Sequence, residues 1–198
     1  MKMSGRQKLL KTFYPIFSVF NYLTGRGTGI HKAKSGSIPP ASIYEMEVLL
    51  NTGQNISLSS LQGKKILIVN TASNCGYTPQ YEELQELKEM FRDKLEIIGF
   101  PANDFKEQEK GNDDEIAHFC KVNYGVSFPL VTKSTVKPGP GQHPVFQWLT
   151  SKEKNGWNGH PPSWNFSKYL LDEEGRLIFC FDPSVSPISK EMLSAIES

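Results

Sequence analysis

The segment "KILIVNTASNCGYTPQYEELQELKEMF", residues 65–91, joins a strand pattern to a helix pattern and places one cysteine between them. The apolar run at its start has strand length and is typical of a central strand that is covered on both faces. Thr78 followed by Pro79 predicts a helix start with Thr78 as the N-cap. Four side chains at helical spacing then predict one buried face: Tyr81, Leu84, Leu87 and Phe91. We therefore expect a β–α unit with Cys75 at its turn.

Similar patterns predict the rest of the domain. We expect two short strands within 44–61, a buried strand within 94–103, a short strand within 127–133, a helix within 143–152, a hairpin over 164–183 and a terminal helix over 188–198. Asn112 and Glu115 resemble a capping box for a helix that ends at Gly125. Strands that alternate with helices and then form an antiparallel pair predict an α/β domain with a mixed sheet.

The bulk composition suits one globular domain with an appendage. The chain has 198 residues, of which 38% are hydrophobic and 22% charged, and a net charge of +1 that argues against general nucleic-acid binding. The charge is uneven, because residues 1–44 contain no acidic residue and seven basic ones: Lys2, Arg6, Lys8, Lys11, Arg26, Lys32 and Lys34. We expect an N-terminal extension and linker over 1–40, with Gly, Ser and Pro enriched over 25–42, and a compact domain over 41–198.

The extension contains an apolar segment over residues 9–23 that is too interrupted to span a bilayer. Its basic flank and aromatic side chains favour peripheral contact with a membrane surface. Packing on its own domain or disorder is the second alternative, and a cleaved or targeting sequence is the third. The protein is expected in the cytoplasm, with this segment as its candidate membrane contact or targeting signal.

Cysteine usage fits a reducing compartment. Three cysteines without a C-x-x-C motif, Cys75, Cys120 and Cys180, make neither a secreted disulfide scaffold nor a zinc knuckle. Cys180 is expected in the core, and His143 and His160 are expected in loops rather than as metal ligands.

Cys75 precedes a helix N-terminus, where the helix dipole favours thiolate. The dipole supplies at most about 2 kcal/mol, which lowers a thiol pKa by fewer than about two units. A strongly activated thiolate would need further hydrogen-bond donors. Thr78 stands where a dithiol exchanger has its second cysteine, so reaction with a peroxide stays open beside the alternative of a buried structural cysteine.

Three motifs resemble the glutathione peroxidase family. "VNTASNCGYTPQYEEL" resembles its peroxidatic-cysteine motif, "GFPANDFKEQEKGNDDEI" its second motif and "WNFSKYLLDEEG" its third, in the family's order, and the resemblance covers about residues 43–197. It implies a thioredoxin-like fold and a peroxidase that reduces hydrogen peroxide and organic or lipid hydroperoxides in the response to oxidative stress. No metal and no cofactor are expected.

The resemblance carries a catalytic tetrad onto Cys75, Gln108, Trp164 and Asn165. Amide and indole N–H groups stay neutral at any working pH, and donors aimed at one sulfur favour thiolate over thiol. They would also stabilise charge that develops on the peroxide oxygens. Attack by Cys75 would leave a sulfenic acid.

The resemblance further implies that Cys120 resolves this sulfenic acid as an internal disulfide, which thioredoxin or glutathione would then reduce. The alternative is that Cys120 is a buried helical residue. Ala102, Asp104 and Lys106 depart from the family's second motif, and Ala102 removes another candidate thiol. The segment before Trp164 lacks the longer insertion that is linked to tetramers in the family, so the resemblance implies a monomer or a weak dimer.

Two other classes of function use the same residues differently. A redox sensor or relay would pass oxidation from Cys75 to a partner protein. A metal or electron-transfer module is weaker, because such sites need two or more close Cys or His ligands.

Overall fold

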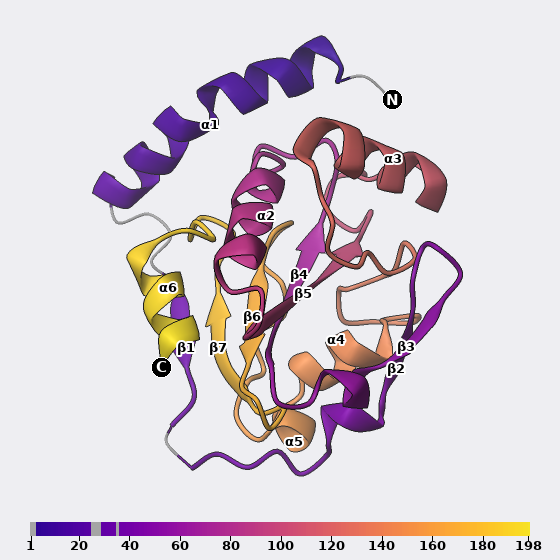
Figure 1. Cartoon of the computed structure of the whole chain (residues 1–198), viewed down its shortest axis with the longest axis vertical. Coiled ribbons are helices and arrows are strands. Elements are labelled where there is room, and N and C mark those ends of the chain that lie inside the picture. The colour runs from indigo at the N-terminus through magenta and orange to yellow at the C-terminus, as the bar shows by residue number, and fades with distance from the viewer. Residues whose placement is uncertain (1–2, 25–28, 35) are drawn as a thin grey trace.

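The computed structural model describes residues 3–24, 29–34 and 36–198, apart from some side chains of the first helix (Figure 1). Its strands are β1 (Ile30–Lys32), β2 (Glu47–Leu49), β3 (Asn55–Ser57), β4 (Lys65–Thr71), β5 (Leu95–Pro101), β6 (Lys168–Leu171) and β7 (Leu177–Phe181). Its α-helices are α1 (Gly5–Thr24), α2 (Gln80–Met90), α3 (Asp113–Tyr124), α4 (Pro144–Leu149), α5 (Lys152–Asn155) and α6 (Lys190–Glu197), and short 3₁₀ helices cover Ile43–Glu45 and Leu58–Leu61.

A mixed sheet in the order β1-β7-β6-β4-β5 organises the domain. β4 pairs parallel to β5 and antiparallel to β6, and the other neighbours are antiparallel. β4 is buried on both faces because its side chains alternate: Leu67 and Val69 enter the cluster under α2, α3 and α6, whereas Ile66 and Ile68 enter the cluster under α4. The predicted fold class is confirmed.

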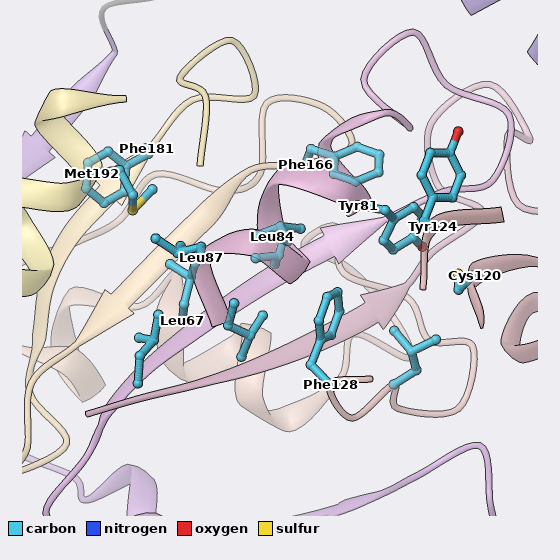
Figure 2. Close-up of a cluster of buried hydrophobic side chains, with 14 of the residues drawn as sticks. Leu67, Tyr81, Leu84, Leu87, Cys120, Tyr124, Phe128, Phe166, Phe181 and Met192 are labelled. Atoms are coloured by element: carbon cyan, nitrogen blue, oxygen red, sulfur yellow. The ribbon is translucent and has the colours of Figure 1, made fainter. Parts of the chain in front are cut away.

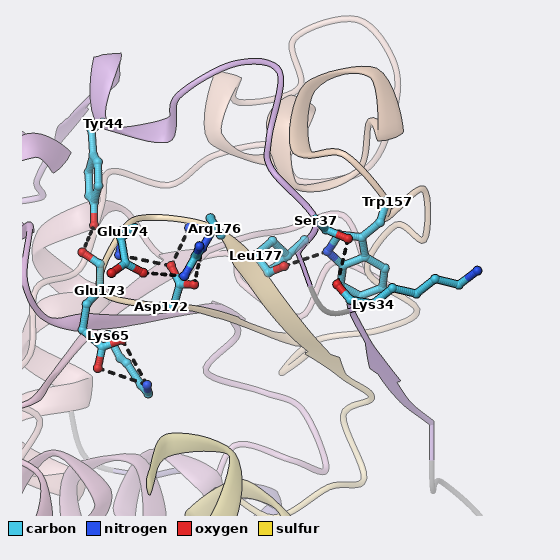
Figure 3. A network of polar contacts seen from close by, with 10 residues as sticks. All are labelled: Lys34, Ser37, Tyr44, Lys65, Trp157, Asp172, Glu173, Glu174, Arg176 and Leu177. Carbon is cyan, nitrogen blue, oxygen red and sulfur yellow. Dashed lines mark hydrogen bonds and ion pairs between the residues drawn. The ribbon is translucent and has the colours of Figure 1, made fainter. Parts of the chain in front are cut away.

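The β6–β7 hairpin turns where the sequence predicts, and polar contacts fasten it to the sheet (Figure 3). The carboxylate of Asp172 accepts a 2.6 Å bond from Nε of Arg176 across the turn. Nζ of Lys65, at the start of β4, lies 3.1 Å from Glu173, and the hydroxyl of Tyr44 donates to the Glu173 carbonyl at 2.9 Å. The hairpin that begins just after residues 164–165 is thereby held to β4.

Two predicted elements differ in the structure. The expected strand over 127–133 contributes only isolated bridges, Leu130 with Gly99 and Val131 with Leu50. Pro129 lacks the N–H that a ladder needs, which explains the short pairing. Within the expected linker, residues 30–32 form the edge strand β1 on β7, and residues 25–28 and 35 lie outside the described residues.

Helix α1 lies against the domain beside α2 and α3, so the structure shows the packing alternative for the extension (Figure 1). Gln7 and Tyr14 are buried in this contact. Lys11 forms an ion pair with Glu82 of α2 at 3.0 Å. Among the residues that the structure describes, no helix combines the length and apolar character needed to cross a membrane.

Candidate active site

Cys75 lies in the turn between β4 and α2, and Thr78 holds this turn. The Thr78 hydroxyl accepts a 2.9 Å bond from the Cys75 N–H and donates a 2.8 Å bond to the Ala72 carbonyl. The prediction that Thr78 caps α2 is wrong, because Pro79 takes the N-cap position and the Thr78 hydroxyl is already occupied inside the loop. Thr78 therefore shapes the backbone around the thiol.

The Cys75 sulfur is almost completely buried, with 1% of the residue exposed. The Tyr77 N–H donates to Sγ at 3.4 Å. Burial raises the pKa of the Cys75 thiol, and hydrogen bonds from Tyr77, Asn165, Trp164 and Gly76 lower it in part. Loss of hydration thus outweighs the donors in this closed reduced form, but each donor still favours the thiolate.

Trp164 and Asn165 reach the sulfur from a turn before β6, and Asn70 secures that turn. Nδ2 of Asn70 donates to the Trp164 carbonyl at 3.1 Å, and the Phe166 N–H donates to the Asn70 carbonyl at 2.6 Å. Phe166 has a φ of 68°, a left-handed conformation that the surrounding bonds must maintain. Asn70 was not predicted as a site residue, although a polar residue near the end of an apolar strand is a usable signal.

Gln108 joins the site through Asn165 rather than at the sulfur. Nδ2 of Asn165 donates to the side-chain carbonyl of Gln108 at 2.9 Å. The Asn74 N–H donates to the Gln108 backbone carbonyl at 3.1 Å. Gln108 is not among the donors to Cys75. The structure therefore brings Cys75, Trp164 and Asn165 together and places Gln108 beside Asn165.

Glu109 is a further buried polar residue that the sequence analysis did not single out. Its Oε2 accepts from the Ser73 N–H at 2.8 Å and from the Ser73 hydroxyl at 3.0 Å. Burial raises the pKa of Glu109 to about 7, against the lowering effect of the Ser73 bonds. Glu109 ties the Gln108 loop to the Cys75 loop, and the pair Gln108–Glu109 in the second motif was its signal.

The Gln108 loop departs from ordinary backbone geometry just before the glutamine. Lys106 and Glu107 have φ values of 51° and 50°. Nζ of Lys106 lies 5.7 Å from the centroid of a Trp164 ring, and Phe105 packs against Trp164 at 5.4 Å between centroids. Lys106, one of the residues that depart from the family motif, therefore lies over Trp164.

Cys120 lies on α3, fully buried in the same apolar cluster as Cys75 (Figure 2). Burial raises its pKa to about 12, and a contact with the Tyr81 hydroxyl lowers it in part. The thiols of Cys75, Cys120 and Cys180 are all free. Cys180 is buried in the second cluster, as predicted.

The histidines serve the fold. Nδ1 of His143 accepts from the Val145 N–H at the start of α4. His160 stacks on His31 of β1 at 4.4 Å between centroids. Within the described part of the chain, no group of three or more His, Cys, Asp or Glu residues could hold a metal ion.

Comparisons with known proteins show the family of this chain. The family model described as glutathione peroxidase matches residues 43–150. The chain is 47% identical over 148 residues to "Glutathione peroxidase homolog BsaA" of Halalkalibacterium halodurans, which covers 74% of this chain and 93% of that protein. It is 39% identical over 163 residues to "Glutathione peroxidase-like peroxiredoxin HYR1" of Saccharomyces cerevisiae, with 79% and 99% covered.

Solved structures give the same result. The structure titled "Trgpx in apo form" superimposes with a TM-score of 0.60 at 32% identity, over 80% of this chain and 97% of that chain. A thioredoxin family protein from Chlorobium tepidum superimposes with a TM-score of 0.57 at 16% identity, over 83% and 96%. The second similarity concerns the fold alone.

Proposed function

The chain belongs to the glutathione peroxidase family and is a thiol peroxidase with a thioredoxin-like fold; we propose that Cys75 is its peroxidatic residue. The Cys75 thiolate attacks one peroxide oxygen, the O–O bond breaks, and water or an alcohol leaves after taking up a proton. Cys75 is left as a sulfenic acid. The observation that carries this proposal is the buried Cys75 sulfur at the β4–α2 turn, which accepts from the Tyr77 N–H at 3.4 Å and whose pKa, although raised by burial, is lowered in part by the neighbouring Asn165 and Trp164 side chains.

The neighbouring residues have distinct proposed roles. Trp164 and Asn165 stabilise the thiolate and the charge that develops on the leaving oxygen, since preorganised donors are effective in a water-poor site. Gln108 orients Asn165 by accepting its amide hydrogen bond. When a peroxide is present, the Gln108 amide N–H is free to turn toward its oxygens.

Cys120 is the proposed resolving residue. Its sulfur attacks the Cys75 sulfenic acid, forms an S–S bond and releases water. Cα atoms must come within about 7 Å for this bond. Because Cys120 is fully buried on α3, we propose that α3 loosens after Cys75 is oxidised.

An external dithiol, thioredoxin, or glutathione then reduces the disulfide. The substrates are hydrogen peroxide and organic or lipid hydroperoxides. Both electrons come from thiols, so the proposed reaction uses no prosthetic group. We propose that the protein acts in the response to oxidative stress, in the cytoplasm, as a monomer or weak dimer.

The test is hydrogen peroxide consumption with thioredoxin and with glutathione. Cys75→Ser should abolish turnover, Cys120→Ser should abolish thioredoxin-linked turnover, and Cys180→Ser serves as the matched control. Activity that survives Cys75→Ser would discard the mechanism. Full thioredoxin-linked turnover in Cys120→Ser would discard only the resolving step.

We also propose that α1 contacts a membrane surface. Leu9, Phe13 and Ile16 are 58%, 54% and 66% exposed and recur on the side of the helix away from the domain. Arg6 and Lys8 are exposed beside them and would attract anionic lipid. A variant carrying Leu9→Glu, Phe13→Glu and Ile16→Glu should lose binding to vesicles of phosphatidylserine and phosphatidylcholine. Unchanged binding would remove this proposal.

A further inference from the structure

Helix α1 lies before the part of the chain that the family model matches, yet it touches the loop that carries Cys75. Nε2 of Gln7 donates a buried 2.8 Å hydrogen bond to the Ser73 carbonyl. The Arg6 guanidinium donates to the side-chain carbonyl of Asn74 at 3.1 Å. The first turns of α1 are therefore fixed one and two residues from the reactive thiol.

A second set of contacts fixes the middle of α1 on α2 and α3. Nζ of Lys11 donates to the Asn123 carbonyl at 3.4 Å and lies 4.8 Å from the Tyr124 ring centroid. The Tyr14 hydroxyl donates to Glu83 of α2 at 3.3 Å. These contacts hold the first turns and the middle of α1 on the domain, so α1 forms one wall beside the Cys75 and Gln108 loops.

Between this wall, the two active-site loops and α3 lies a cavity of about 340 Å³. Its lining comes from α1 and the turn before it (Ser4, Gln7), the Cys75 loop (Ser73, Asn74), the Gln108 loop (residues 107–111) and α3 (Glu115, Ile116, Phe119). Cys75 does not line the cavity itself. Gln108 lines it and also contacts Asn165, which stands at the sulfur.

We propose that this cavity receives the organic group of an uncharged, compact alkyl or aryl hydroperoxide, and that α1 thereby sets the peroxide selectivity of the enzyme. The inference rests on the proposed function, since it assigns a substrate class to that same site. A molecule in the cavity would direct its peroxide group past Gln108 toward Cys75.

The size of the cavity points to an organic substrate. Hydrogen peroxide is comparable to one or two waters, and a water occupies about 30 Å³ in the liquid. Pockets for small organic ligands begin at about 300 Å³. Ile116 and Phe119 close the α3 side of the cavity and are themselves almost fully buried, so accessible apolar surface for such a group comes from the aliphatic parts of exposed lining residues such as Lys110.

The charge of the lining selects against anions. Glu107, Glu109 and Glu115 line the cavity with one cation, Lys110. Nζ of Lys110 lies 3.0 Å from a carboxylate oxygen of Glu107, so this exposed ion pair neutralises the charge of Lys110. Above about pH 7, where Glu109 is ionised, a carboxylate, as in a fatty-acid hydroperoxide, would meet Glu109 and Glu115 and be repelled.

The experiment measures the second-order rate constant for oxidation of the reduced full-length protein, followed by tryptophan fluorescence. The substrates are hydrogen peroxide, cumene hydroperoxide and the anionic hydroperoxide of linoleic acid. We expect Gln7→Ala, which releases the α1 wall, to lower the ratio of the cumene to the hydrogen peroxide rate constant at least fivefold. Thr12→Ala, on the exposed side of the same helix, should leave this ratio within twofold.

A second variant acts from the opposite wall. Ile116→Phe enlarges a residue that lines the cavity from α3 and should lower the same ratio at least fivefold without touching α1. The wild-type protein should prefer cumene hydroperoxide over the linoleic acid hydroperoxide at least fivefold. Equal losses for both peroxides in the two variants, or a preference for the anionic substrate, would overturn the proposal.

Binding supplies a readout independent of turnover. Cumyl alcohol, the product of cumene hydroperoxide reduction, should shift the Ile116 methyl resonances in Cys75→Ser, and the shift should weaken in Gln7→Ala. If millimolar cumyl alcohol causes no shift, the cavity does not bind the organic group, and the proposed peroxidase function is unaffected. Peroxidase activity in Cys75→Ser would instead sink the proposed mechanism, and the alcohol titration would still decide whether the cavity binds.

Discussion

Nδ2 of Asn165 donates a 2.9 Å hydrogen bond to the side-chain carbonyl of Gln108, 57 positions earlier in the chain. Asn165 also lies at the Cys75 sulfur, where its hydrogen bond lowers the thiol pKa. One amide therefore links the Gln108 loop to the reactive thiol. Gln108 acts in this arrangement through Asn165.

This link predicts an order of severity. Asn165→Ala removes a donor at the sulfur and should lower the rate of Cys75 oxidation by hydrogen peroxide about 100-fold. Gln108→Ala removes a contact to Asn165 and should lower it less, about tenfold. Stopped-flow oxidation of the reduced variants measures both. A larger loss in Gln108→Ala would show that its amide acts on the peroxide directly.

The Cys75 reaction should accelerate with pH. The thiolate is the reactive form, and burial raises the pKa of Cys75 above its ordinary value. Cys75 is therefore mainly in the thiol form at neutral pH, and its thiolate fraction rises as the pH approaches that pKa. Alkylation of the Cys120→Ser/Cys180→Ser protein by iodoacetamide should show a rate that climbs from about pH 6 to beyond about pH 9. A rate that is constant over this range would contradict the prediction.

Thr78→Val should weaken the fold and the site together. The hydroxyl satisfies the Cys75 N–H and the Ala72 carbonyl, both buried. Valine has the same shape without either bond, so the loss should be about 2 to 3 kcal/mol in the free energy of unfolding. Urea unfolding measures it, with Thr12→Val on α1 as a control expected to change stability by less than about 0.5 kcal/mol. Equal stability of the two variants would show that the two hydrogen bonds of the Thr78 hydroxyl do not stabilise the loop.

Glu109 should make stability depend on pH in a defined direction. Burial raises its pKa to about 7 in the folded protein, above its value in the unfolded chain. The folded state therefore holds a proton that the unfolded state releases between about pH 4.5 and pH 7, and this contribution to stability falls as pH rises through that window. The decrease should be about 3 kcal/mol.

Glu109→Gln isolates this contribution, because glutamine can still accept from Ser73 but cannot ionise. The difference in unfolding free energy, wild type minus variant, should fall steadily from about pH 5 to about pH 7 and then level off. Urea titrations at intervals of half a pH unit measure it. A difference that grows with pH would reverse the sign and contradict the argument.

Much of the fold could be predicted because its signals are local. The apolar run of β4, the capping box of Asn112 and Glu115 and the turn at residues 172–175 each depend on a few consecutive residues. Thr78 was assigned wrongly because the same local pattern fits a helix N-cap and a side chain that forms hydrogen bonds within the preceding loop. Choosing between them needs the position of the Ala72 carbonyl.

The site was predictable only as a set of residues. The motifs name Cys75, Gln108, Trp164 and Asn165, but their spacing does not say which of them touch. Asn70 and Glu109 escaped notice because their partners, the Trp164 turn and Ser73, come from other segments of the chain. The position of α1 depends equally on distant contacts, above all that of Gln7 with Ser73.

The sequence by itself determined the family and the fold class and predicted Cys75 as the reactive thiol, since these follow from local periodicity and from motifs in a set order. Tertiary structure decided the balance at that thiol: burial raises the pKa of Cys75 while Trp164 and Asn165 oppose the rise. It also decided that a helix outside the family match stands beside the active-site loops. The physical reason is that desolvation and hydrogen bonding depend on distances between segments far apart in the chain, which no local pattern contains.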